Sequence, residues 1–210
     1  MPDRVNRTGF PMGHKFLERG AAYYDAVYLS GDYVEKMKRP WNKQPARLVT
    51  WYPALMLTEG SIFEVGCGCG HLAQMCAEYG VDYSGGFDFS KEAIKIARLN
   101  TPGSGFALAD ARTARAEGLI RSAQYDTLVA LEVLEHVWAD LDLVEAIPAG
   151  RVFVASVPDF QTEGHVRWFS KKQQVRARYG SLLHIDKVVE EVGVNSDNRW
   201  FTFRGVRKDD

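Results

Sequence analysis

From residue 60 onward, two kinds of apolar pattern alternate along the chain. Nearly continuous apolar runs at 62–65, 125–131 and 151–157 are typical of strands buried on both faces of a parallel sheet. Between such runs, stretches like 91–99 place apolar residues at helical spacing. The alternation predicts a doubly wound α/β fold, with a mostly parallel sheet, right-handed crossovers and helices on both faces.

The elements can be placed by their breakers and caps. We expect strands at 62–65, 81–88, 106–110, 125–131 and 151–157, and helices that begin at 71, 91, 111 and 134. Ser90 is a suitable N-cap for the second helix, and Pro102 and Gly103 end it. Pro148 ends the fourth helix, which we expect to run from 134 to 147.

The two ends of the chain differ from this central part. Residues 170–179 look like a helix with a basic outer face, and 182–192 and 199–207 alternate as two strands. The first 60 residues carry no strand pattern and are expected to be helical. Trp41 and the stretch 51–53, which ends in a proline, mark expected bends in that segment.

Composition narrows the class of protein. The 210 residues fit one domain, and 46% hydrophobic with 25% charged residues is typical of a globular protein. Lys plus Arg (26) nearly cancels Asp plus Glu (27), so charge gives no reason to expect nucleic acid. No apolar run approaches the ~20 residues that span a bilayer. The first ten residues lack the apolar core of a signal peptide, so we expect a cytoplasmic protein without membrane contact.

The most informative stretch is a glycine turn between the first strand and the helix after it. Gly66, Gly68 and Gly70 stand at alternate positions, where a chain without Cβ atoms can turn sharply and let a ligand lie against the backbone. A dinucleotide-binding turn needs a small residue five positions after the first glycine, and that position holds His71. The turn therefore argues against a nicotinamide cofactor. Cys67 and the other two cysteines have no second Cys/His pair at zinc spacing, so we expect no metal.

Four ordered motifs resemble one family. Glu64-Val-Gly-Cys-Gly-Cys-Gly is similar to the first motif of class I S-adenosylmethionine (SAM) methyltransferases, and Gly86-Phe-Asp-Phe-Ser is similar to their second. Leu131-Glu-Val-Leu-Glu-His resembles a run found in small-molecule methyltransferases related to those of quinone biosynthesis. The stretch 156–170 resembles the Pro-Asn … His-Leu-Arg-Phe-Phe-Ser pattern of type 11 and ubiquinone-type enzymes, with Asp159 in place of the commoner Asn.

The resemblance implies a fold and a division of the chain. In this family the two C-terminal strands form an antiparallel hairpin that completes a seven-stranded, mostly parallel sheet. We expect residues 1–210 to form a single methyltransferase domain. Within it, 1–59 would be an N-terminal helical lid segment and 60–210 the SAM-binding core.

The resemblance also implies ligand roles. Asp88, 22 positions after Gly66, would bind the ribose hydroxyls, although it can also be a surface acid near a helix start. Asp110 would meet the adenine amino group, and an N-cap is an equally good interpretation. Glu64 and the backbone near Leu131 would lie at the methionine end. The expected SAM-binding residues are Glu64, Gly66, Cys67, Gly68, Gly70, Asp88, Phe89, Asp110, Ala111, Leu131, Glu132 and His136.

Two histidines are candidates for the catalytic base. His136 follows the fourth strand and His165 lies in the loop after the fifth, and an imidazole titrates near neutral pH. A structural role, or contact with SAM alone, is the alternative for His136. The expected acceptor-binding residues are Tyr24, Tyr28, Asp159, His165 and Arg167. Tyr24 and Tyr28, one helical turn apart, share a face, but core packing explains such a pair as well.

Together these residues predict SN2 methyl transfer to an oxygen or nitrogen of a small molecule, which enters between the N-terminal helices and the loop at 158–169. The alternatives are a non-catalytic SAM-binding protein and a protein methyltransferase. The Asp/Asn-Pro-Pro-aromatic motif of amino-directed nucleic-acid methyltransferases is absent after the fourth strand, which argues against that substrate. The sequence leaves open the acceptor's identity and whether the protein is a monomer or a homodimer.

Overall fold

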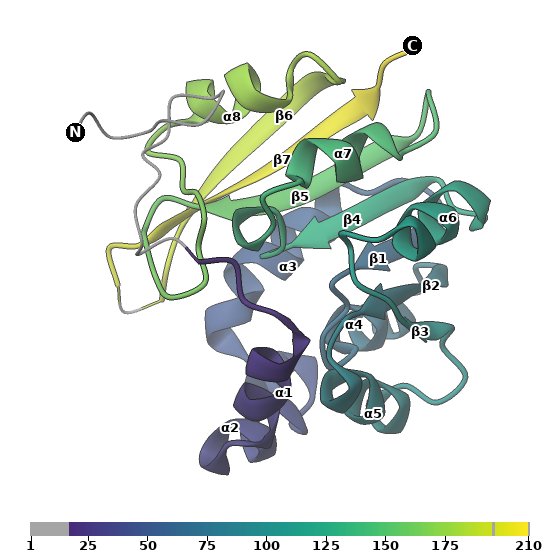
Figure 1. The fold of residues 1–210 in the computed structure, drawn as a ribbon, viewed down its shortest axis with the longest axis vertical. Coiled ribbons are helices and arrows are strands. Elements are labelled where there is room, and N and C mark those ends of the chain that lie inside the picture. The colour runs from purple at the N-terminus through teal and green to yellow at the C-terminus, as the bar shows by residue number, and fades with distance from the viewer. Residues whose placement is uncertain (1–16, 195, 210) are drawn as a thin grey trace.

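A seven-stranded sheet in the order β3-β2-β1-β4-β5-β7-β6 organises the chain in a computed structural model that describes residues 17–194 and 196–209 (Figure 1). All neighbouring pairs from β3 to β5 are parallel, whereas β7 is antiparallel to both β5 and β6. This confirms the predicted fold class and the C-terminal hairpin. The strands are β1 (Ile62–Val65), β2 (Tyr83–Asp88), β3 (Phe106–Leu108), β4 (Thr127–Leu131), β5 (Val152–Pro158), β6 (Leu183–Val192) and β7 (Arg199–Arg207).

Helices cover both faces of this sheet. The first face carries α3, α4 and α5, and the second carries α6, α7 and α8. The N-terminal helices α1 and α2 lie beside α5 at the edge of the molecule, as Figure 1 shows. The helices are α1 (Ala21–Leu29), α2 (Gly31–Met37), α3 (Pro45–Leu57), α4 (His71–Tyr79), α5 (Lys91–Asn100), α6 (Ala114–Ser122), α7 (Asp140–Glu145) and α8 (Lys172–Tyr179), with single 3-10 turns η1 (Trp41–Lys43) and η2 (Leu134–His136).

The strand order reverses between β1 and β4, because β2 and β3 extend to one side and β5 to the other. In open α/β sheets, the loops at the carboxyl ends of the strands separate at such a reversal and leave a crevice for ligands. The glycine turn after β1 and the segment after β4 both open into this place. The topology therefore brings the two most unusual motifs of the sequence side by side.

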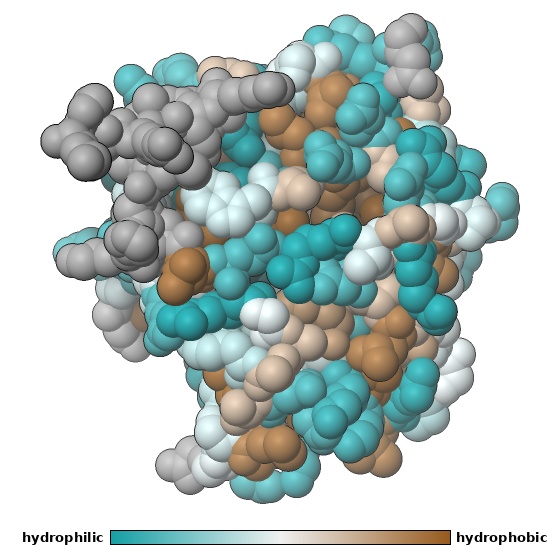
Figure 2. Space-filling view, in the orientation of Figure 1, coloured by the Kyte–Doolittle hydropathy of each residue, from teal (hydrophilic) through white to brown (hydrophobic). Residues whose placement is uncertain are grey.

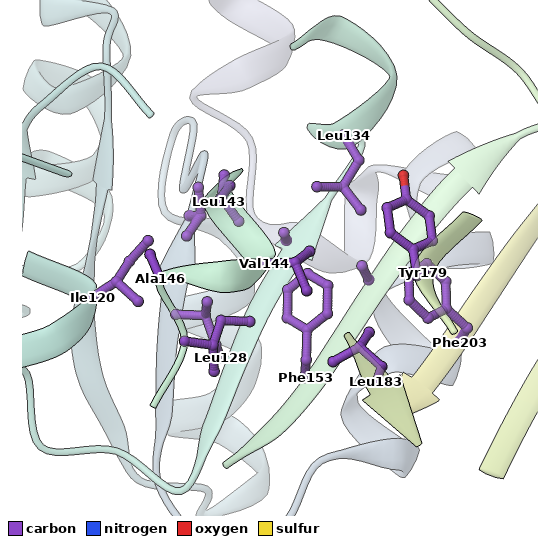
Figure 3. Packing of buried hydrophobic residues seen from close by; sticks show 14 of the residues in the cluster. Ile120, Leu128, Leu134, Leu143, Val144, Ala146, Phe153, Tyr179, Leu183 and Phe203 are labelled. Atoms are coloured by element: carbon purple, nitrogen blue, oxygen red, sulfur yellow. The ribbon is translucent and has the colours of Figure 1, made fainter. Parts of the chain in front are cut away.

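The larger core cluster fills the second face of the sheet. Leu128 and Phe153 from the strands pack against Leu143 and Val144 of α7, and Tyr179 of α8 stacks on Phe203 (Figure 3). All of these side chains are buried. The burial of such apolar area is the main stabilising contribution to folding and fixes the sheet that carries the site.

One predicted helix is wrong in its length. Instead of a helix over 134–147, the chain forms the turn η2, an irregular stretch at 137–139, and then α7. The physical reason is that the carbonyl groups of Leu134, Val137 and Trp138 accept hydrogen bonds from the guanidinium of Arg167 and not from a helical N–H. Apolar spacing alone did not reveal this competing donor.

The predicted bends in the N-terminal segment are half right. Trp41 opens the turn η1, as expected, but the stretch 51–53 does not interrupt α3. Pro53 lies inside this helix, whose residues Ala54 and Leu55 are buried against the sheet. We attribute the tolerance of the proline to this packing, which offsets the one backbone hydrogen bond that proline removes.

The face of the molecule drawn in Figure 2 mixes polar and apolar residues. In the orientation of Figure 2, hydrophilic residues run across the centre of the face and hydrophobic residues are scattered around them. No helix among the described residues is long and apolar enough to cross a membrane. The expectations for the first ten residues lie outside the described part of the chain.

Candidate functional site

A cavity of about 530 Å³ opens at the strand reversal, within the size range of ligand pockets. Its walls come from α1, α2 and α3, from the glycine turn, from the ends of β2, β3 and β4, and from residues 160–165. All of the predicted SAM-binding residues except Gly70 line it. The cavity thus joins the predicted cofactor segments with the N-terminal helices and with residues of the loop after β5.

The glycine turn presents its backbone to this cavity. Gly66 and Gly68 have φ values of +70° and +51°, in the left-handed region that favours glycine. A Cβ on Gly66 would lie 2.4 Å from Cγ2 of Val133, and one on Gly68 would lie 3.3 Å from the Tyr28 hydroxyl on the opposite wall. Gly70 instead faces α5, where a Cβ would meet Ala97 and Thr101. Gly70 therefore allows the turn to pack closely against α5 and does not face the cavity.

Asp88 ends β2 with its carboxylate fixed beside the glycine turn. Oδ2 accepts a hydrogen bond from the Gly68 N–H (3.0 Å), and Oδ1 accepts one from the Ser90 N–H (2.8 Å). Burial raises the pKa of Asp88 to about 6, although these backbone N–H groups counteract the rise. Each oxygen keeps further acceptor capacity toward the cavity. The alternative of a surface acid is wrong, since Asp88 is buried.

Glu64 lies in β1 at the floor of the cavity. Its Oε2 accepts a hydrogen bond from the Tyr83 hydroxyl (2.8 Å). Burial raises the pKa of Glu64 to about 8, against the effect of that hydrogen bond. At neutral pH the carboxyl group is therefore held largely in its protonated form.

Asp110 and Ala111 follow β3 at the edge of the cavity. The Asp110 carboxylate accepts hydrogen bonds from the backbone N–H and the guanidinium of Arg112, which lower its pKa. The N-cap of α6 is Thr113, so the N-cap interpretation of Asp110 is wrong. Its position at the cavity is consistent with a contact to the ligand.

The two candidate bases lie against each other. The rings of His136 and His165 have centroids 4.8 Å apart and meet edge to face. His136 Nδ1 is 3.0 Å from the Gly164 carbonyl oxygen, and His165 Nδ1 is 3.1 Å from that of Phe160. A carbonyl can only accept, so both Nδ1 atoms carry the hydrogen and both Nε2 lone pairs are left available. Neither Nε2 has a hydrogen-bond partner among the described residues.

Burial keeps both imidazoles neutral. Loss of solvent lowers the pKa of His136 to about 4, with the nearby His165 adding to the effect, and it also lowers the pKa of His165. Tyr24 contributes to the same site, since its hydroxyl lies 3.0 Å from His136 Nδ1. Tyr24 also packs on Phe89. Tyr24 and Tyr28 both line the cavity, so the predicted shared face is directed at it.

A buried carboxyl group, that of Glu135, lies next to the two histidines. Glu135 is fully buried, and neither of its oxygens has a hydrogen-bond partner within the described part of the chain. Desolvation raises the pKa of Glu135 well above its usual value, and the charge of Glu132 adds to this. One ligand atom each from Glu135, His136 and His165 lies within 4.8 Å of the others. Imidazole and carboxylate together are a donor set for a divalent metal ion, so these three residues can hold one.

Two predicted acceptor ligands have other partners. Asp159 does not line the cavity, and its carboxylate binds the backbone N–H and Nε of Arg199 (both 2.7 Å). Arg167 is buried, with 1% exposure, and its guanidinium binds backbone carbonyls. We correct both assignments. The motif placed them in the right loop but did not show that their side chains turn away from the cavity.

Two of the residues missed by the sequence interpretation come from outside the motifs. Arg47 of α3 lines the cavity, 3.4 Å from the Tyr33 hydroxyl. Trp200 of β7 also lines it and donates from Nε1 to Glu132 Oε2 (2.8 Å). Glu132 itself has φ +57°, an uncommon conformation for a residue other than glycine. Only the tertiary structure brings Arg47 and Trp200 to the site.

Comparisons with known proteins agree with this geometry. A family model described as "Methyltransferase domain" matches residues 63–147. A ubiquinone biosynthesis O-methyltransferase from Sinorhizobium fredii is 29% identical over 158 residues, which cover 68% of this chain and 62% of the relative. One from Xylella fastidiosa is 32% identical over 54% of this chain and 48% of the relative. The chain thus spans about half to three-fifths of the length of these relatives.

Solved structures of low sequence identity share the fold. The N-methyltransferase NodS from Bradyrhizobium japonicum, in complex with S-adenosyl-L-homocysteine (SAH), has a TM-score of 0.64 at 16% identity, covering 90% of this chain and 98% of that one. A protein from a study of disulfide conversion to a thioacetal in echinomycin biosynthesis has a TM-score of 0.65 at 19% identity, covering 90% and 93%. Sheet order, glycine turn and family match agree: the chain has the fold of class I SAM-dependent methyltransferases and is similar to members of that family.

Proposed function

We propose that this protein transfers a methyl group from SAM to an oxygen of a small-molecule acceptor. The similarity to ubiquinone biosynthesis O-methyltransferases supports oxygen over nitrogen as the acceptor atom. The cavity volume of about 530 Å³, within the size range of small-molecule pockets, supports a small acceptor over a protein segment.

The residues on the glycine-turn side fit the cofactor. The Gly66–Gly68 backbone lies open to the cavity, and Asp88 offers carboxylate oxygens for ribose hydroxyls. We assign to Arg47 the carboxylate of the methionine portion, because a guanidinium is the natural partner of a carboxylate and Arg47 lines the wall. When bound, SAM supplies the electrophilic sulfonium methyl. We also propose that α1, α2 and α3, within the 1–59 segment, form the lid over this cavity.

The residues on the other side fit an acceptor hydroxyl. A neutral imidazole with an available Nε2 accepts the proton that the hydroxyl loses as its oxygen is methylated. The aromatic rings of Tyr24 and Phe160 contact the two histidines, Trp200 packs on Phe160, and all three line the cavity, where they would limit access of water to the acceptor. The single observation that carries the proposal is this pair of neutral, tautomer-fixed histidines in the cavity that also contains the SAM-type turn.

Two measurements test the proposal. Titration calorimetry with SAM and SAH should show one site per chain, and transfer of radiolabelled methyl from SAM to a panel of hydroxylated and amino compounds should show turnover on a hydroxyl. Binding without turnover on any acceptor would favour the non-catalytic alternative. Turnover confined to amines would overturn the choice of oxygen.

Glu135 supports a second mechanism for the same methyl transfer, in which a divalent metal ion replaces the histidine base. An unpaired carboxylate beside two imidazoles whose Nδ1–H groups donate to carbonyls has the arrangement typical of metal-ligating histidines. In this mechanism a divalent cation at Glu135, His136 and His165 would bind the acceptor oxygen and favour its deprotonation. The two mechanisms differ in one measurement. Activity that persists in EDTA supports the base, whereas activity that is lost in EDTA and restored by Mg²⁺, Mn²⁺ or Zn²⁺ supports the metal.

A further inference from the structure

Behind the histidine pair lies a buried ionic cluster that the proposed function does not use. Arg167 and Asp140 are 1% and 0% exposed, with Arg167 Nη2 3.2 Å from Asp140 Oδ1. Asp140 also accepts hydrogen bonds from Arg178 Nε (2.7 Å) and from the Tyr179 hydroxyl (2.8 Å). In Figure 3 the Tyr179 hydroxyl points away from the ring of Phe203.

Arg167 directs its other donors into the turn that carries His136. Nη1 donates to the carbonyls of Leu134 and Val137, and Nη2 donates to that of Trp138 (3.1 Å). The adjacent Val166 N–H donates to the Glu135 carbonyl (2.7 Å). Residues 166 and 167 together therefore bind four of the five carbonyl groups from 134 to 138.

These hydrogen bonds join the two segments that hold the candidate bases. His136 is in the turn, and His165 precedes the bonded residues by one position, so the bonds hold together the two segments whose imidazole rings lie 4.8 Å apart. The planar guanidinium has five donors in a rigid fork, which allows one side chain to reach three carbonyls and Asp140 together. A lysine ammonium has three donors on a flexible stem and cannot reproduce this pattern.

Stability alone does not account for the cluster. Buried ion pairs carry a large desolvation penalty, and replacing them with apolar residues is often neutral or stabilising. In some proteins such groups instead contribute conformational specificity. In this chain the geometry that they define is that of the loop with Glu135 and His136.

We propose that Arg167 is a positioning residue for methyl transfer, which holds His136 and His165 in their mutual arrangement through the carbonyls of residues 134–138. This inference rests on the proposed function. It differs from a direct acceptor contact, because Arg167 acts only through the segment that it binds.

The test replaces Arg167 by Met, which is of similar length, and by Lys, which keeps the charge beside Asp140. The readouts are kcat per SAH-binding site counted by calorimetry, KM for the acceptor, and imidazole ¹⁵N spectra at one pH. We expect Arg167→Met to lower kcat per site about 10- to 100-fold, as a displaced reacting group does, with SAH affinity within about threefold. Arg167→Lys should lie between Met and wild type. The ¹⁵N signals of both imidazoles should shift.

The matched control is Tyr179→Phe, which removes a buried hydroxyl from the same cluster and leaves the Arg167 hydrogen bonds in place. It should lower the melting temperature while keeping kcat per site within about threefold. Equal kcat losses in the control and in Arg167→Met, or unchanged kcat and imidazole spectra in both Arg167 variants, would overturn the positioning role. An inactive wild-type protein would instead overturn the proposed function itself.

Discussion

The two halves of the cavity are built in different ways. On the β1–β2 side, backbone groups and one carboxylate from a continuous stretch, 64–90, form the wall. On the β4–β5 side, the functional side chains come from α1, from the segment after β4, from the loop after β5 and from β7. A buried ionic cluster holds this second side together. The comparison indicates that most of the cofactor side depends on local chain geometry, with Arg47 of α3 added by packing, whereas the acceptor side depends on long-range packing throughout.

The glycine turn should give the largest effect. Gly68→Val introduces a branched side chain at φ +51°, directed across the cavity at Tyr28. We expect SAH affinity to fall at least about 100-fold, since both the backbone conformation and the ligand space are lost. The control is Gly103→Val, at φ +88° with no neighbour within 4 Å, which is strained but does not line the cavity. Tight SAH binding by Gly68→Val would refute the assignment of the turn.

The histidine pair tests the other side. Replacing His136 by Asn should lower kcat by about 10²-fold or more, the contribution typical of a positioned base, and should leave SAH affinity nearly unchanged. The same change at the exposed His184 of β6 serves as a control. If the loss falls on SAH binding, His136 contacts the cofactor and is not the base. Such a result would mean that both halves of the cavity bind the cofactor.

Glu64 provides a pH test of the cofactor side. Its pKa is raised to about 8 in the folded state, so the folded protein binds more protons than the unfolded chain between pH 4.5 and 8. This contribution to stability is present below pH 4.5 and is lost as the pH rises toward 8, by about 1.4 kcal/mol for each unit of pKa difference. Glu64→Gln should therefore flatten the fall in the free energy of unfolding over this range. Urea titrations of both proteins at pH 5, 6, 7 and 8 measure it, and parallel pH profiles would contradict it.

Tyr24→Phe should give the smallest effect. The change removes only the hydroxyl beside His136 Nδ1 and leaves the hydrogen bond from this atom to the Gly164 carbonyl. We expect kcat to fall about two- to tenfold, corresponding to one neutral hydrogen bond of about 1 kcal/mol. Steady-state kinetics beside Tyr23→Phe, a neighbouring tyrosine with no bond to His136, check this. A loss as large as that of His136→Asn would mean that Tyr24 itself takes part in proton transfer.

The sequence by itself determined the fold class, the seven strands, and the placement of the glycine turn, Asp88 and His136 at one cavity. It did so because strand burial and turn chemistry depend on near neighbours in the chain. Only the tertiary structure decided the break after residue 136, the inward turn of Arg167, the pairing of Asp159 with Arg199, and the arrival of Arg47 and Trp200 at the site. Each of these depends on a partner from a distant part of the chain, and a buried polar group takes the partner that packing brings to it.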